Sequence, residues 1–156
     1  MNHDSMRISQ FGITLIEVVL VTGIIGVLMS IALPSYQQYV EGAKVDTALV
    51  DVEMIQQKIV RYIASGNALP PANLNTIGLG NMQDPWGNNY VYLRFFGING
   101  TTSFRKNQNM VPINSDYDLY SKGKDGSSQK PIVSDVSQDD IIRARNGKFV
   151  GLASDF

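Results

Sequence analysis

An uninterrupted apolar run near the start of the chain limits what this sequence can fold into. The run from Ile13 to Leu33 is 21 residues long and contains one charged side chain, Glu17. A transmembrane α-helix needs about 20 apolar residues, because each residue adds about 1.5 Å along the axis. The run therefore predicts a membrane-spanning helix near the N-terminus.

The position of Glu17 within this run indicates a function for its carboxylate. An ionised acid inside a bilayer costs roughly 2.5–3.5 kcal/mol on insertion scales, so an acid in such a segment is expected to have a purpose. If the chain is cut after Gly12, the new amino group of Ile13 precedes Glu17 by one helical turn, and residues four apart share a helix face. We expect this amine, or that of a neighbouring subunit, to neutralise the carboxylate.

The stretch from Gly12 to Glu17 resembles the N-terminal motif of the type IV pilin and type II secretion pseudopilin family. The shared pattern is a short leader ending in Gly, then an apolar residue, Thr-Leu-Ile-Glu and a long apolar helix. The resemblance implies that a prepilin peptidase cleaves after Gly12, that Ile13 becomes N-methylated, and that Glu17 acts in assembly. Ile13 stands where the family most often has Phe. The alternative interpretation is a plain signal anchor that carries a single Glu.

The first residues fit such a leader. Met6 is an alternative start, since Met6 to Gly12 would be a leader more typical of the family. Arg7 on the short side of the helix favours a cytoplasmic leader, with the rest of the chain outside.

Composition excludes several other classes of protein. The chain has no Cys, which rules out a disulfide framework and thiolate metal sites. Its single histidine, His3, lies in the predicted leader, and there is no Gly-rich phosphate loop, so we expect no enzyme. A net charge of −1 without a basic tract predicts no nucleic-acid partner.

The apolar run also contains small residues and ends at a proline. Gly23, Gly26 and Ser30 fall on one stripe, where another helix can approach closely. Pro34 lacks a backbone donor and clashes with the preceding turn, so a kink or local melting is expected there.

Beyond Pro34 the pattern predicts an amphipathic helix that lays one face on a core. Ser65-Gly66-Asn67 and Pro70-Pro71 then end it, so the whole helix is expected from about Ile13 to Ser65. The apolar positions that recur at steps of three and four, or their multiples, are Tyr36, Val40, Ala48, Val52, Ile55, Ile59 and Tyr62.

The rest of the chain predicts a small antiparallel sheet. A turn over residues 84–88 leads into a strand over 90–96, and the Asn-Gly at 99–100 favours a hairpin into a second strand over 101–104. Alternation over 116–121 predicts a third strand. The Asp-Pro-Trp-Gly-Asn turn before a Tyr-rich strand resembles the major pseudopilins of type II secretion, and its Trp86 is expected in the core.

The segment from Tyr120 to Gly126 resembles the start of the calcium-binding loop of major pseudopilins. The resemblance implies as ligands Asp125, Asp139, Asp140 and the backbone carbonyl of Lys122, and Ca²⁺ prefers such oxygen donors. The alternative is a capping box, since Ser-x-x-acid over 137–140 is typical of a helix start.

These patterns together predict an α+β, pilin-like fold, with a long N-terminal helix, half of it transmembrane, packed on a small antiparallel sheet with an irregular C-terminal loop. The predicted parts are a leader (1–12), a transmembrane and assembly half of the helix (13–33), and a periplasmic domain (34–156).

The resemblance implies a pseudopilus subunit for type II secretion, held in the bacterial inner membrane by lipid contact and polymerised with copies of itself in the periplasm or at the cell surface. The implied partners are the prepilin peptidase, the inner-membrane assembly platform with its ATPase, and minor pseudopilins. Two alternatives are a type IV pilin for adhesion, motility or DNA uptake, and a membrane-anchored ion-binding module that never polymerises.

Overall fold

The computed structural model of the chain describes residues 12–100 and 102–156. Most of the predicted leader, with His3 and Met6, and residue 101, where the second strand was predicted to begin, lie outside the described residues. The chain divides into two compact units, with the boundary between Val40 and Glu41.

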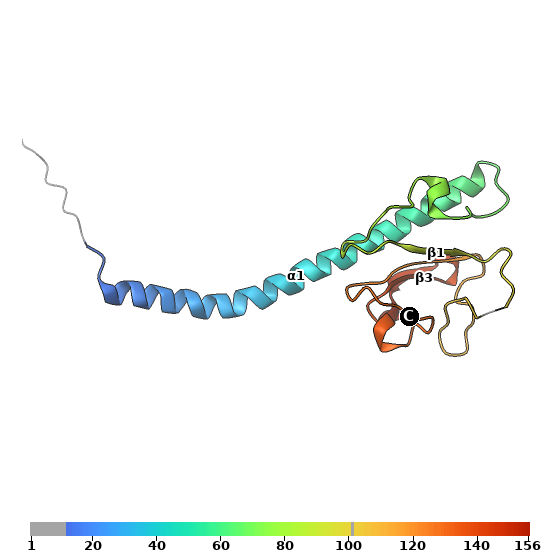
Figure 1. The fold of residues 1–156 in the computed structure, drawn as a ribbon. Helices are drawn as coiled ribbons and strands as arrows, with labels where there is room; N and C mark the ends of the chain where they lie inside the picture. Colours follow the sequence, from blue (N-terminus) through green and yellow to red (C-terminus); the bar gives the residue numbers. More distant parts are fainter. Residues whose placement is uncertain (1–11, 101) are drawn as a thin grey trace, which may run out of the picture. The chain divides into compact units, whose positions relative to one another are not determined.

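One long helix, α1 (Leu15–Ala64), contains 50 residues and belongs to both units (Figure 1). Its bounds confirm the prediction of a helix from about Ile13 to Ser65. At its end Gly66 adopts φ +103, a left-handed conformation that glycine accepts without strain, and its N–H donates to the Ile63 carbonyl at 3.2 Å. Pro34 lies inside α1, and the helix continues through it, so the local melting expected there is not observed.

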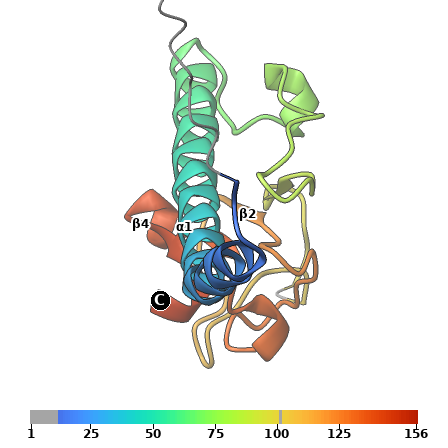
Figure 2. The ribbon, with the colours of Figure 1, turned by 90° about the vertical axis from the view of Figure 1, so that its left-hand side faces the viewer.

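The second half of α1 packs through one face, as its apolar spacing predicts. Its fully buried side chains are Ala48, Val52, Ile55 and Ile59. They form one core cluster with Tyr117 and Leu119 of the sheet. Figure 1 shows the sheet along one side of this part of the helix, and Figure 2 shows the same helix viewed from its N-terminal end.

The sheet has four antiparallel strands in the order β1-β2-β3-β4. These are β1 (Val91–Arg94), β2 (Tyr117–Ser121), β3 (Ile141–Ala144) and β4 (Phe149–Leu152). In β3 successive side chains point to opposite faces, so Ile141 joins the cluster under α1 while Ile142 joins a second cluster on the far face. The second cluster also contains Ile113, Ile132, Ala144 and Ala153.

Two predicted elements are wrong. Within residues 102–104 the predicted second strand does not form: Phe104 is buried against Phe95, with ring centroids 4.2 Å apart, and β1 pairs directly with β2. The helix start at Ser137, which was the alternative to a calcium loop, is also absent from the described residues. The Ser137 hydroxyl accepts the Gln129 N–H instead of capping a helix, and a short 3₁₀ turn over Asp135–Ser137 leads into β3.

Candidate assembly surface and acidic loop

The N-terminal half of α1 presents apolar side chains on every side. All residues from 12 to 39 are exposed, and Leu15 is 85% exposed. By length and composition α1 is able to cross a membrane. A helix that is apolar all round needs lipid or other helices around it.

The hydroxyl groups of Thr22 and Ser30, inside the apolar run, are satisfied within the helix. Thr22 donates to the Val18 and Val19 carbonyls at 3.0 Å, and Ser30 donates to the Val27 carbonyl at 2.7 Å. Such self-contained hydrogen bonds remove the cost of placing hydroxyl groups in an apolar medium.

Glu17 lies in the first turn of α1, where its N–H donates to the Thr14 hydroxyl at 3.3 Å. Its carboxylate shares a shallow surface with Ile13 and Val21. Ile13 is 77% exposed and lies next to Gly12, the first described residue. Cleavage at Gly12, methylation of Ile13 and an assembly role for Glu17 stay predictions.

The predicted turn over residues 84–88 forms, and its aspartate is buried. Asp84 is 5% exposed, and its Oδ1 accepts the N–H groups of Trp86 and Asn88 at 3.1 and 2.8 Å. Its Oδ2 accepts the Ser121 hydroxyl at 2.5 Å. Asp84 thus joins the turn to the end of β2. The segment between β2 and β3, residues 122–140, is called the acidic loop from here on.

Trp86 was predicted to lie in the core, and it is partly buried there. Its ring packs against the core cluster under α1, and its indole N–H donates to Glu41 Oε1 at 2.6 Å. Glu41 also pairs with Lys124 of the acidic loop at 3.5 Å. The turn and the acidic loop therefore both contact the same helical carboxylate.

The structure separates the four predicted calcium ligands. The Asp125 N–H donates to Asp139 Oδ2 at 3.0 Å, so these two residues lie together. Lys122 precedes them on the same loop. Asp140 instead points into the domain, where its Oδ2 is 2.6 Å from Arg105 Nη2 and accepts the Ser128 hydroxyl at 2.6 Å.

The electrostatics of Asp140 follow from its burial. Its side chain is 0% exposed. Burial raises the pKa of Asp140, while the guanidinium of Arg105 and the Ser128 hydroxyl act in the opposite direction. Both of these partners hold the carboxylate inside the domain.

The complete predicted ligand set does not fit a Ca²⁺ ion. Within residues 12–100 and 102–156, no three His, Cys, Asp or Glu side chains are grouped to hold a metal. Asp140 is already paired with Arg105 and is fully buried, whereas Asp125 is exposed. Calcium binding through Asp125, Asp139, Asp140 and the Lys122 carbonyl stays a prediction, and the contacts of Asp140 do not favour it.

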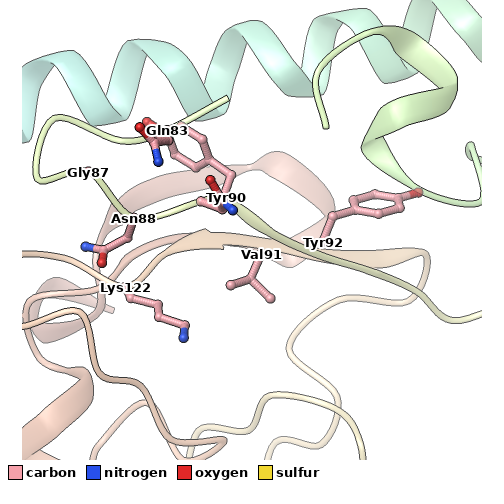
Figure 3. Close-up of a pocket in the computed structure, with 8 residues that line it drawn as sticks. Gln83, Gly87, Asn88, Tyr90, Val91, Tyr92 and Lys122 are labelled. Carbon is pink, nitrogen blue, oxygen red and sulfur yellow. The ribbon is translucent and has the colours of Figure 1, made fainter. Parts of the chain in front are cut away.

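A polar pocket of about 560 Å³ lies beside β1, and no sequence pattern predicted it (Figure 3). Asn88 and Lys122 lie at one end of it, and the Asn88 side-chain amide donates to the Gly123 carbonyl at 3.1 Å. Tyr90 points toward α1, where its hydroxyl donates to Asp51. The other residues that line the pocket are Gln83, Gly87, Asn89, Val91 and Tyr92. The pairing of a turn with a loop more than thirty residues later leaves no sequence signal.

The fold and the exposed apolar helix define a pilin-like class: a long N-terminal helix, able to cross a membrane, that continues into a small α+β domain. No family model matches the chain, and no solved structure matches it.

Curated relatives identify the family. The type II secretion system core protein G of Pseudomonas aeruginosa is 30% identical over 140 residues, covering 77% of this chain and 87% of the relative. The type IV major pilin protein PilE of Neisseria gonorrhoeae is 26% identical over 147 residues, covering 91% and 87%. A fimbrial protein of Neisseria meningitidis serogroup A is 29% identical over 123 residues, covering 78% and 72%. The chain belongs to the type IV pilin and type II secretion pseudopilin family, as its N-terminal motif predicts.

Proposed function

We propose that this chain is a filament subunit of the type II secretion pseudopilus, polymerised through the apolar half of α1. The observation that carries the proposal is the exposure of every residue from 12 to 39, on a helix that continues into a folded domain. In the membrane these side chains contact lipid, and in a filament they contact the same segment of other subunits. Pilin and pseudopilin relatives support this assignment.

Processing precedes assembly in this proposal. The prepilin peptidase removes residues 1–12 at the inner membrane, and Ile13 becomes the methylated N-terminus. The Glu17 carboxylate then pairs with an N-terminal amine, which neutralises both charges in an apolar surrounding. Mass spectrometry of the mature protein tests this order, and a terminus at Leu33 would contradict it.

Assembly is tested by crosslinking in the bacterium that encodes the chain. A photo-crosslinking residue at Leu28, which is 62% exposed, is expected to give a ladder of multimers. The same residue at Lys58, on the exposed face of α1 in the domain, is the matched control for contacts outside the apolar half. A monomer alone at Leu28 would favour the membrane-anchored module that never polymerises.

A second candidate function is a type IV pilin for adhesion, motility or DNA uptake, which the PilE and fimbrial relatives favour. Deletion of the gene separates the two. The pseudopilus proposal expects exported proteins to disappear from the medium while surface filaments persist, and a pilin gives the opposite result. The platform protein, its ATPase and the minor pseudopilins are the partners that the pseudopilus proposal implies.

A further inference from the structure

Arg105 crosses the interior of the domain and joins segments that are far apart in sequence. It lies in the loop between β1 and β2 and is 3% exposed. Its Nη2 donates to Asp140 Oδ2 at 2.6 Å, and its Nη1 donates to the Ser128 hydroxyl at 2.7 Å. The guanidinium carbon lies 4.0 Å from the ring centroid of Tyr120 in β2. One side chain thus joins the middle of the acidic loop, at Ser128, and its end, at Asp140, to Tyr120 of the sheet.

The charge on Asp140 requires a cation at this place. A carboxylate with no exposed surface is costly to bury unless it is paired and hydrogen-bonded. Arg105 supplies a charge that is not lost at any physiological pH. Asp125 is exposed and Asp139 is partly exposed, so water screens both. The fully buried negative charge of the loop therefore already has a cation at its Oδ2, while its Oδ1 has no hydrogen-bond partner among the described residues.

The two ends of the loop also touch directly. The Asp125 N–H donates to the Asp139 carboxylate at 3.0 Å. Gly123 approaches so closely that a Cβ there would lie 2.2 Å from the Asp139 carbonyl oxygen. Gly123 also adopts φ +63 and donates its N–H to the Ser121 hydroxyl. Protein atoms therefore bridge Asp139 to the start of the loop.

The backbone of Arg105 is held by contacts that do not involve its side chain. Its N–H donates to the buried Asp118 at 3.1 Å, and its carbonyl accepts the Ile113 N–H at 3.2 Å. Phe104 stacks on Phe95 next to it. A side chain anchored in this way loses less freedom when it binds a carboxylate.

We propose that Arg105 is the resident cation of the acidic loop and takes the bridging role that a Ca²⁺ ion would otherwise have. The domain then keeps the same stability whatever the Ca²⁺ concentration around it. This inference is independent of whether the filament serves secretion or adhesion, because it concerns the fold of each subunit.

The test uses the full chain in detergent micelles and needs no mutation for its first part. Trp86 is the single tryptophan and packs on the core, so its fluorescence reports unfolding of the domain by urea. An ion present at a hundred times its Kd lowers the unfolding equilibrium constant about a hundredfold. We expect less than a twofold difference between excess Ca²⁺ and excess chelator. A difference of tenfold or more would overturn the proposal.

The second part compares Arg105→Met with Lys106→Met, a matched control at the neighbouring exposed position. Both variants lose one positive charge, but only Arg105→Met leaves Asp140 unpaired inside the domain. We expect the unfolding equilibrium constant to rise at least a hundredfold for Arg105→Met and less than threefold for Lys106→Met. Equal stability of the two variants would refute the role of Arg105. If Arg105→Met does not fold, the chelator comparison on the unmodified chain still decides.

Discussion

Arg143 offers the sharpest test of how the domain is held on its helix. This β3 side chain is 4% exposed. Its Nη1 and Nη2 each lie 2.8 Å from a carboxylate oxygen of Asp116, and its Nε donates to Gln56 of α1 at 2.8 Å. Its guanidinium carbon also lies 3.9 Å from the ring centroid of Tyr117. Arg143→Ala removes the ion pair, the link to the helix and the stacking together.

The magnitude follows from these contacts. Removing one member of a buried ion pair costs about 3–5 kcal/mol. The Asp116 side chain is 34% exposed and regains contact with water when Arg143 is removed, so we expect the cost of breaking this ion pair to be near the lower end of that range. Loss of the stacking adds roughly 0.5–2 kcal/mol, so we expect a total of about 4 kcal/mol. For a domain of this size each kcal/mol lowers Tm by roughly 3–6 °C, so the expected shift is about 12–24 °C.

The assay is thermal unfolding of the full chain in detergent, followed by Trp86 fluorescence. Lys148→Ala, an exposed position beside β4, is the control and is expected to stay within about 0.5 kcal/mol of the original chain. An Arg143→Ala variant that melts within 5 °C of the unmodified chain would show that this network does not hold the helix on the sheet.

Three further predictions concern assembly, packing and pH. Glu17→Ala is expected to insert in the membrane at least as well but to form far fewer multimers on crosslinking, because its partner amine is left unpaired; a normal ladder would remove Glu17 from assembly. Ile55→Ala, fully buried, should cost about 2–5 kcal/mol by urea unfolding, while Val60→Ala on the exposed face should change stability little. Burial raises the pKa of Tyr117 to about 12. The unfolded chain loses this proton near pH 10 while the folded chain keeps it, so stability should fall by roughly 1 kcal/mol per pH unit between pH 10 and 12. Tyr117→Phe should lose that contribution in an alkaline titration.

The long helix was the most predictable part of the molecule. A continuous apolar run followed by three- and four-residue spacing leaves no other regular structure that satisfies both patterns. The buried Ala48, Val52, Ile55 and Ile59 are four of the seven positions that the pattern selected. Tyr36 is 66% exposed, because the domain begins only after it.

The last two strands were missed for a physical reason. In β3, Ile141 and Ile142 are buried on opposite faces, so the segment lacks the alternation that marks a strand with one wet face. The Ser-x-x-Asp pattern over 137–140, just before this strand, is typical of a helix start. Local pattern favoured a helix, and pairing with β2 and β4 decided otherwise.

The acidic loop shows a similar limit. The resemblance to major pseudopilins implied that Asp125, Asp139 and Asp140 belong to one calcium site. Nothing in the sequence indicated that Arg105, from a loop before β2, pairs with Asp140. A partner 35 residues away is set by the sheet, not by local spacing.

The burial of Asp84 has a consequence for the evolution of such chains. Its carboxylate serves its own turn through two N–H groups and the end of β2 through the Ser121 hydroxyl, which in turn accepts the Gly123 N–H. The Asp-Pro-Trp-Gly-Asn turn and the loop after β2 are therefore far apart in sequence but form one hydrogen-bonded unit in the fold. Substitutions at Asp84 and Ser121 are expected to covary among descendants of this sequence. Losing either residue leaves the other's polar group buried without that hydrogen-bond partner.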